Sequence, residues 1–163
     1  MTTLRALAAV AALAASPAPA QTEAEAIASN FGLAVDLCLQ HTRDRNPVDA
    51  FRAAGFTVTP ADEGTYNVET LGVSGFLAPL LLNEWCWVES RQLPLADVQR
   101  IGYERALFRH PQAGAQPAAR GTLANGCPSI SLAIGGRITL LEFRNAGFFQ
   151  GCNAPDTGGI LFQ

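Results

Sequence analysis

The sequence has few of the residues that most enzyme mechanisms use. It contains no lysine and two histidines among 163 residues, and only 15 % of the chain is charged. The formal net charge of -3 is spread without acidic or basic runs, which argues against nucleic acid or an anionic membrane surface as the main partner. Hydrophobic residues make up 48 % of the chain, too large a share for intrinsic disorder. One compact domain is therefore expected.

The sequence motifs of the common enzyme classes are also missing. There is no G-x-x-x-x-G-K-[ST] phosphate loop, no G-x-G-x-x-G dinucleotide motif, no H-E-x-x-H zinc motif and no G-x-S-x-G nucleophile elbow. Asp156-Thr157-Gly158 matches the three-residue core of aspartic proteases, but the chain lacks the second copy that would share the proton. We interpret these residues as a turn and expect no cofactor.

The first twenty residues have the pattern of a cleaved secretory signal. Arg5 and the amino terminus supply positive charge, Ala6–Ala15 form an apolar run, and Ala18-Pro19-Ala20 has the small residues of a cleavage site. The apolar run is too short to span a bilayer, and no later stretch is long enough. We therefore expect cleavage before Gln21, a periplasmic or secreted protein with no transmembrane segment, and a single domain over residues 21–163.

The four cysteines, Cys38, Cys86, Cys127 and Cys152, are an even number in a chain expected to be exported, which favours two disulfides. Sequence alone leaves three pairings open. We favour Cys38 with Cys86 and Cys127 with Cys152, because each bridge then links a predicted helix or strand to another element. No two cysteines have the close spacing of a zinc knuckle or a thioredoxin-like motif, so we expect no metal.

Hydrophobic periodicity predicts three helices. Thr22 and Glu25 form a capping-box pattern before an apolar stripe that includes Cys38, which predicts a helix over residues 23–40. Asn46-Pro47 and Gly55 mark the two ends of a short second helix. A third helix is predicted over residues 95–108.

Alternating patterns predict strands at 56–59, 66–71, 85–89, 130–134, 137–144 and, as an edge strand, 159–163. Gly135-Gly136 is a hairpin turn signal, Phe148-Phe149 is a candidate extension of the sheet, residues 73–82 are ambiguous, and residues 110–126 resemble a long surface loop. The order of elements predicts an α+β domain. Its antiparallel sheet of about five or six strands carries the N-terminal and central helices on one face and is held by two disulfides.

Acid-base chemistry that needs a histidine has to use His41 or His110. Both lie where a predicted helix ends, a position at which a histidine commonly interacts with the last carbonyl groups. A small secreted hydrolase that pairs one of them with Asp36, Asp44 or Glu104 is therefore an alternative hypothesis rather than the leading one.

Trp85 and Trp87 are the first candidates for a binding site. Alternation places both on one face of a strand together with Glu89, and Cys86 on the other face. Two indoles on one face can stack against a sugar or a partner side chain. We nevertheless favour the interpretation that they fill the core beneath a helix, because a domain with two tryptophans usually buries them.

The apolar C-terminal segment is the second candidate. Ile160 and Phe162 could add to a partner by strand pairing if the segment forms an exposed edge. The leading hypothesis is thus a small non-enzymatic periplasmic or secreted protein that acts as a binding, inhibitory or assembly partner of another envelope component, or binds a small ligand. A purely structural envelope protein is the third hypothesis.

Overall fold

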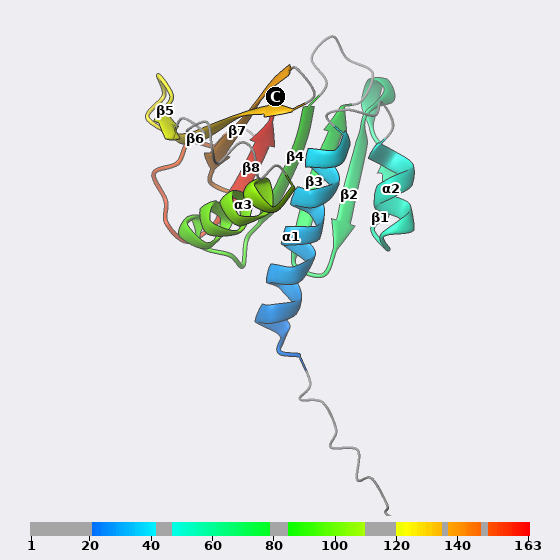
Figure 1. Ribbon diagram of the computed structural model, residues 1–163. Helices are drawn as coiled ribbons and strands as arrows, with labels where there is room; N and C mark the ends of the chain where they lie inside the picture. The colour runs from blue at the N-terminus through cyan, green and yellow to red at the C-terminus, as the bar shows by residue number, and fades with distance from the viewer. Residues whose placement is uncertain (1–20, 42–46, 79–84, 110–119, 135–136, 148–149) are drawn as a thin grey trace, which may run out of the picture.

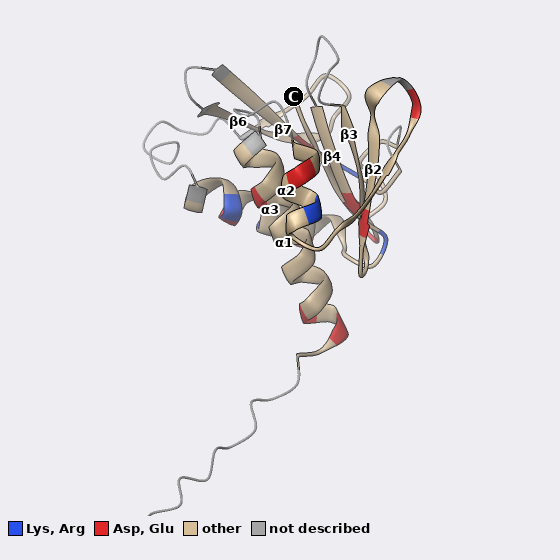
Figure 2. Ribbon diagram, turned by 90° about the vertical axis from the view of Figure 1, so that its right-hand side faces the viewer, with Lys and Arg blue, Asp and Glu red and all other residues tan. Residues whose placement is uncertain are grey.

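The structure, a computed structural model, describes residues 21–41, 47–78, 85–109, 120–134, 137–147 and 150–163. Within these ranges, three α-helices lie on one face of an eight-stranded antiparallel sheet (Figures 1 and 2). The helices are α1 (Glu23–His41), α2 (Pro47–Ala53) and α3 (Leu95–Arg109). The predicted α+β class is confirmed. The predicted signal, the Gly135-Gly136 turn and Phe148-Phe149 lie outside the described residues.

The strands follow the order β1-β2-β3-β4-β8-β7-β6-β5, and each neighbouring pair is antiparallel. Their bounds are β1 Thr57–Pro60, β2 Tyr66–Thr70, β3 Val73–Ala78, β4 Trp85–Ser90, β5 Arg120–Thr122, β6 Pro128–Ile134, β7 Arg137–Arg144 and β8 Gly158–Phe162. A short 3-10 helix, Asp62–Gly64, lies between β1 and β2. The sheet is larger than the five or six strands expected from the sequence.

The two additional strands have weak sequence signals. β3 lies in the stretch left ambiguous, where Gly75 interrupts the pattern. A Cβ at Gly75 would lie 2.4 Å from the backbone oxygen of Trp87, so the glycine permits a close approach of β3 to β4. β5 lies in the region interpreted as a loop. Because it has only three residues, it is too short to show an alternating pattern.

The prediction that residues 159–163 form an edge strand is wrong. β8 lies in the interior of the sheet, between β4 and β7, so both sides of its backbone are hydrogen-bonded. The side chains of Ile160 and Phe162 are 0 % and 1 % exposed because they pack into the core beneath the helices. Neither residue is available for strand addition to a partner, and both leave the list of candidate binding residues.

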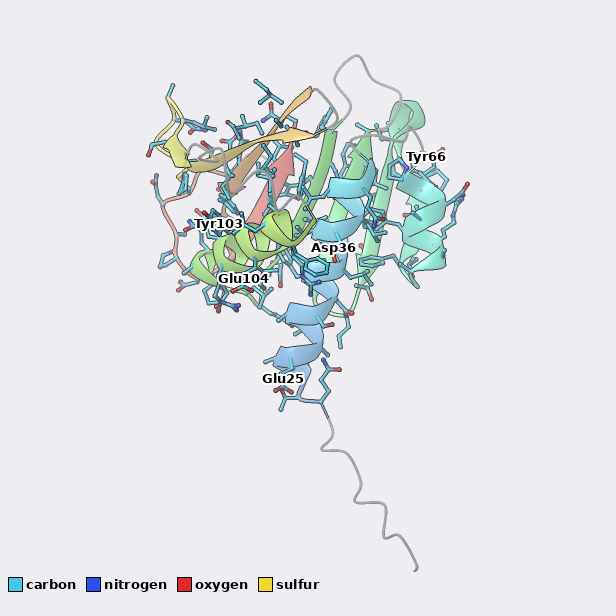
Figure 3. The ribbon with its side chains drawn as sticks, in the orientation of Figure 1. Glu25, Asp36, Tyr66, Tyr103 and Glu104 are labelled. Carbon is cyan, nitrogen blue, oxygen red and sulfur yellow. A yellow bond between two sulfur atoms is a disulfide. The ribbon has the colours of Figure 1, made fainter. Side chains whose placement is uncertain are left out.

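Two contacts fix α3 in its place. At Gly102 a Cβ would lie 2.6 Å from Cδ1 of Ile160 and 2.9 Å from Cε1 of Phe143, so the glycine lets the helix pack closely on β7 and β8. Arg105 donates a hydrogen bond from Nη1 to Oδ2 of the buried Asp36, at 3.1 Å. Asp36 lies on α1 (Figure 3). The helix layer is thus tied together by an ion pair as well as by apolar packing.

Two disulfides connect these elements. Cys38–Cys86 links α1 to β4, and Cys127–Cys152 links the start of β6 to the segment between β7 and β8. This is the pairing that the sequence analysis favoured, and none of the four cysteines is free. Disulfides are compatible with an extracellular or periplasmic location. Among the described residues, no helix is long and apolar enough to cross a membrane.

Candidate functional site

The sheet has one face covered by the helices and one that the helices leave uncovered, which we call the open face (Figure 2). Side chains alternate between the two faces along each strand. In β4, Cys86 and Val88 point to the helix side and belong to the core. Trp85, Trp87 and Glu89 therefore point to the open face, as the alternation predicted.

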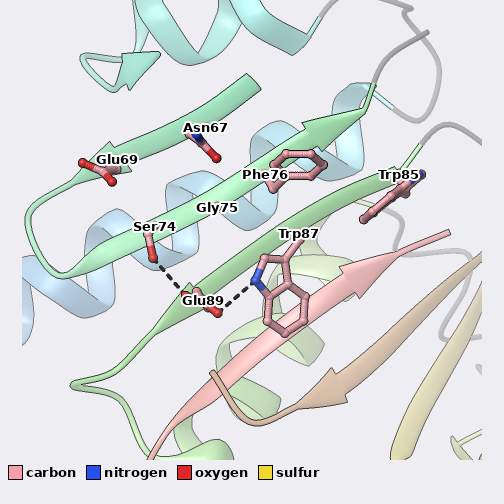
Figure 4. A pocket seen from close by; sticks show the side chains of 8 residues that line it. All are labelled: Asn67, Glu69, Ser74, Gly75, Phe76, Trp85, Trp87 and Glu89. Carbon is pink, nitrogen blue, oxygen red and sulfur yellow. Dashed lines mark hydrogen bonds between the residues drawn. The ribbon is translucent and has the colours of Figure 1, made fainter. Parts of the chain in front are cut away.

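A groove of about 430 Å³ crosses the open face over β2, β3 and β4 (Figure 4). We call it the open-face groove. Its lining combines aromatic, amide, hydroxyl and carboxylate groups: Asn67, Glu69, Ser74, Gly75, Phe76, Trp85, Trp87 and Glu89. Three neighbouring strands supply these residues, so the hydrogen-bonded backbone of the sheet forms the floor of the groove.

Strand register arranges these side chains in two parallel rows. Asn67 is paired with Phe76, which is paired with Trp87 on its other side. The second row runs from Glu69 through Ser74 to Glu89. We call the first the aromatic row and the second the carboxylate row. Because the rows are two residues apart along each strand, they lie about 6.6 Å from one another.

Phe76 and Trp85 form the aromatic pair of the groove. Both side chains are half-buried, and their ring centroids are 5.6 Å apart with an angle of 48° between the ring planes. The two rings therefore meet at a tilt and do not form a flat platform (Figure 4). Trp85 remains a candidate binding residue, and Phe76 joins it.

Trp87 has a different role from Trp85. Its side chain is 3 % exposed, and its indole lies over Gly159 of β8, where a Cβ would approach ring atom Cη2 to 2.5 Å. Its Nε1–H donates to Oε2 of Glu89 at 3.0 Å (Figure 4). The prediction that both tryptophans pack beneath a helix is wrong, because both lie on the open face. Trp87 is buried there and supports the groove.

The carboxylate of Glu89 is held by three uncharged donors. Ser74 donates its hydroxyl to Oε1 at 3.2 Å, and Oε2 accepts hydrogen bonds from Trp87 and from the backbone N–H of Gly147. Gly147 lies 58 residues away along the chain, just after β7. These bonds fix the orientation of the carboxylate without supplying a positive charge.

A second carboxylate on the open face, Glu142 in β7, is buried and closed off from the groove. It accepts hydrogen bonds from Asn125 at 2.7 Å and from Arg144 at 2.8 Å, and its side chain is 2 % exposed. Burial raises the pKa of Glu142, but the hydrogen bonds from Arg144 and Asn125 and the charge of Arg144 outweigh it, so the pKa lies below its ordinary value. Glu142 is therefore an ionised structural group.

Two further hollows are smaller than the open-face groove. One of about 250 Å³ adjoins the open-face groove and shares Glu69 and Ser74 with it, and Arg91 lies on its wall. Another, of about 400 Å³, lies between α3 and the β5–β6 end of the sheet, beside Tyr103 and Glu104 (Figure 3). The charged residues there already form exposed ion pairs within α3, Arg100 with Asp97 and with Glu104, each at 3.4 Å.

The residues of the alternative hydrolase hypothesis are not brought together in the described part of the chain. His110 and Asp44 lie outside it, and the side chain of His41 is not described. Asp36 is paired with Arg105 and Glu104 with Arg100. Among the described residues, no group of His, Cys, Asp and Glu side chains could hold a metal ion.

The sequence pattern pointed to two of the groove residues, Trp85 and Trp87, as binding candidates and missed the rest. Asn67 and Glu69 lie on a predicted strand whose exposed face carried no distinctive signal. Ser74 and Phe76 lie in the stretch that Gly75 made ambiguous. The turn signal at Leu71-Gly72, where Gly72 has φ +69°, could have paired the two strands and shown these side chains on one face.

Comparisons with known proteins add no further assignment. No protein-family model, no curated protein and no solved structure matches this chain.

Proposed function

We propose that the protein is an exported, non-enzymatic binding module that acts as a binding, inhibitory or assembly partner of another envelope component, and that the open-face groove is its binding site. The observation that carries the proposal is the half-buried pair of Phe76 and Trp85 in a groove of about 430 Å³. Aromatic side chains of this kind provide much of the energy of binding interfaces.

The construction of the groove supports a binding role. Its residues lie on three hydrogen-bonded strands, and Trp87 and Glu89 hold one another in place. A site on rigid strands loses little conformational entropy when it binds. The other large apolar side chains that are exposed in the described residues, Leu33, Leu71, Phe108 and Ile138, do not line this groove.

Export is the second part of the proposal. The signal pattern at the amino terminus and the two disulfides both support an oxidising compartment. A partner is therefore to be sought in the envelope or outside the cell.

The test is a quantitative pull-down from the cell envelope with the tagged protein, read by mass spectrometry. Trp85→Ala should abolish capture of the partner, because it removes one ring of the aromatic pair. Phe108→Ala is the matched control, since Phe108 is an aromatic residue that is 73 % exposed and lies on α3, away from the groove. A partner captured equally by both variants, or no partner and no small ligand in any envelope fraction, would contradict the proposal.

A further inference from the structure

The open-face groove has an excess of negative charge. Among the described residues that line it, Glu69 and Glu89 are the two charged ones, and none is cationic. Glu89 accepts hydrogen bonds from uncharged donors only, and Glu69 is exposed and forms no ion pair within the described part of the chain. Arg91 lies on the wall of the adjoining hollow and forms no ion pair with Glu69. The groove therefore favours an occupant that carries positive charge.

The aromatic pair restricts which shapes of ligand the groove can bind. A sugar ring stacks best on a flat aromatic surface, whereas the rings of Phe76 and Trp85 are inclined by 48°. A cationic group or a chain of methylenes can pack against inclined rings, and guanidinium groups pack well on aromatic faces. The tilt thus favours a slender side chain over a pyranose.

The spacing of the two rows also indicates the length of the side chain that the groove can bind. The aromatic row and the carboxylate row are separated by about 6.6 Å, the rise of two residues along a strand. An arginine side chain has an apolar stem of three methylenes followed by a planar charged head, so its stem and head match the two rows in order. Glu69 and Glu89 lie on strands separated by β3, about 9.5 Å apart at their Cα atoms, which leaves room for the head between them.

We infer that the open-face groove binds an arginine side chain of a partner polypeptide, with the stem against Phe76 of the aromatic row and the guanidinium between Glu69 and Glu89. This inference rests on the proposed function. Charge complementarity selects the occupant, since five N–H donors of the guanidinium face two carboxylates and the hydroxyl of Ser74. The ordered carboxylate of Glu89 is the fixed acceptor, and the exposed Glu69 closes over the bound head.

The experiment uses a pair of peptides that differ in charge and not in shape. Acetyl-Gly-Gly-Arg-Gly-Gly-amide and its citrulline counterpart are titrated into the ¹⁵N-labelled protein, and the indole N–H signals of Trp85 and Trp87 are followed by NMR. We expect the arginine peptide to shift both signals and the citrulline peptide to bind at least about fivefold more weakly. Raising the ionic strength from about 0.05 M to about 0.5 M should weaken arginine binding and leave citrulline binding unchanged.

Two variants locate the contact. Glu69→Gln should weaken arginine binding about three- to fivefold, and Glu23→Gln, which removes an exposed carboxylate on α1, should leave it unchanged. Trp85→Ala should weaken it to a similar degree, because Trp85 packs against Phe76, on which the stem lies. Glu69 is preferred to Glu89 for this test, because Glu89 also holds Trp87 and Gly147 and its substitution would disturb the groove.

Equal affinity for the arginine and citrulline peptides would overturn the inference, and so would unchanged affinity in Glu69→Gln. A neutral oligosaccharide such as chitotriose that shifts the same indole signals at lower concentration would also overturn it. Each of these results leaves the proposed function standing, because capture that depends on Trp85 and not on Phe108 is independent of charge. Failure of that capture experiment, with arginine binding intact, would instead contradict the assignment of an envelope partner.

Discussion

Two glutamates on the open face show how surroundings decide what a carboxylate does. Glu142 is paired with Arg144 at 2.8 Å and also bonded to Asn125, so its charge is compensated inside the protein. Glu89, at the wall of the groove, accepts three hydrogen bonds from uncharged groups, and none of these donors is cationic. The charge of one carboxylate is therefore balanced within the fold, and the other is held in a fixed orientation at the groove wall by uncharged donors.

The lowered pKa of Glu142 makes its contribution dependent on pH. Because the folded-state pKa lies below the ordinary value of 4.5, stability from this group is fully present above that pH and is lost as the pH falls through the lowered pKa. Glu142→Gln should reduce the free energy of unfolding by about 1–3 kcal/mol near neutral pH, since it removes the charged acceptor of Arg144. Urea unfolding of both proteins across the pH range measures this difference.

The difference between Glu142→Gln and the unsubstituted protein should shrink as the pH falls well below 4.5, because the glutamate then becomes neutral as well. Glu69→Gln, at an exposed residue of the same sheet, is the control and should change stability little at any pH. A difference for Glu142→Gln that is as large in acid as at neutral pH would contradict the role of its charge.

At the scale of elements, the packing of Trp87 on β8 connects the two halves of the sheet. The indole of Trp87 on β4 occupies the space above Gly159 on β8, where a Cβ would lie 2.5 Å from Cη2 and 2.6 Å from Cζ2. Gly159→Ala should therefore displace the indole and reduce the free energy of unfolding by about 1–3 kcal/mol. Near-UV circular dichroism and tryptophan fluorescence report the displacement, and denaturant unfolding reports the loss.

Gly151→Ala is the matched control for this substitution. A Cβ at Gly151 would meet only Nδ2 of Asn153, at 3.8 Å, which is ordinary contact. This variant should keep the tryptophan spectrum and nearly the full stability. If Gly159→Ala leaves both the spectrum and the unfolding midpoint unchanged, the indole does not depend on the missing side chain.

Elements with local signals were predictable from the sequence. The capping box is present as expected, with the backbone N–H of Thr22 donating to Oε2 of Glu25 at 2.9 Å and the backbone N–H of Glu25 to Oγ1 of Thr22 at 3.3 Å. Hydrogen bonds from the backbone and from the side chain of Thr22 to its carboxylate lower the pKa of the exposed Glu25. The predicted β6–β7 pairing is also confirmed, with Ile134 opposite Arg137. Such features are decided by residues close together in the chain.

The remaining features depend on contacts between distant segments. Nothing near Gly158–Phe162 indicates that this strand enters the sheet between β4 and β7, since a central and an edge strand can share an apolar sequence. The groove needs Glu69, Ser74 and Glu89 in one row, which follows only from the register of three strands. The bond from Gly147 to Glu89 spans 58 residues and has no local signature. The site was therefore only partly predictable.

At the scale of the whole molecule, the two disulfides secure different parts of one sheet. Cys38–Cys86 fastens α1 to β4, the strand that carries both tryptophans. Cys127–Cys152 closes the part of the chain that holds the β6–β7 hairpin and the segment with Gly147. β8 lies between these parts and pairs with both β4 and β7. Each bridge thus restrains one half of the sheet. Together the two halves place the backbone N–H of Gly147 next to Glu89 in the groove.

Removal of either bridge should lower stability by several kcal/mol. The bridges span 48 and 25 residues, for which the chain-entropy relation gives about 4 and about 3.5 kcal/mol. Paired alanine substitutions, Cys38→Ala with Cys86→Ala and Cys127→Ala with Cys152→Ala, avoid placing a serine hydroxyl in the core. Urea unfolding measures the loss, and far-UV circular dichroism should show the same α+β content in all three proteins.

Alkylation of the denatured, unreduced protein provides the covalent check. No thiol should react in the unsubstituted chain, and none in either doubly substituted protein, because the remaining two cysteines are paired with one another. Reactive thiols in a doubly substituted protein would mean that its remaining cysteines do not form the bridge seen in the structure. An unchanged unfolding midpoint after loss of Cys38 and Cys86 would show that α1 is held to β4 by apolar packing alone, and that the bridge adds nothing to the stability of the sheet.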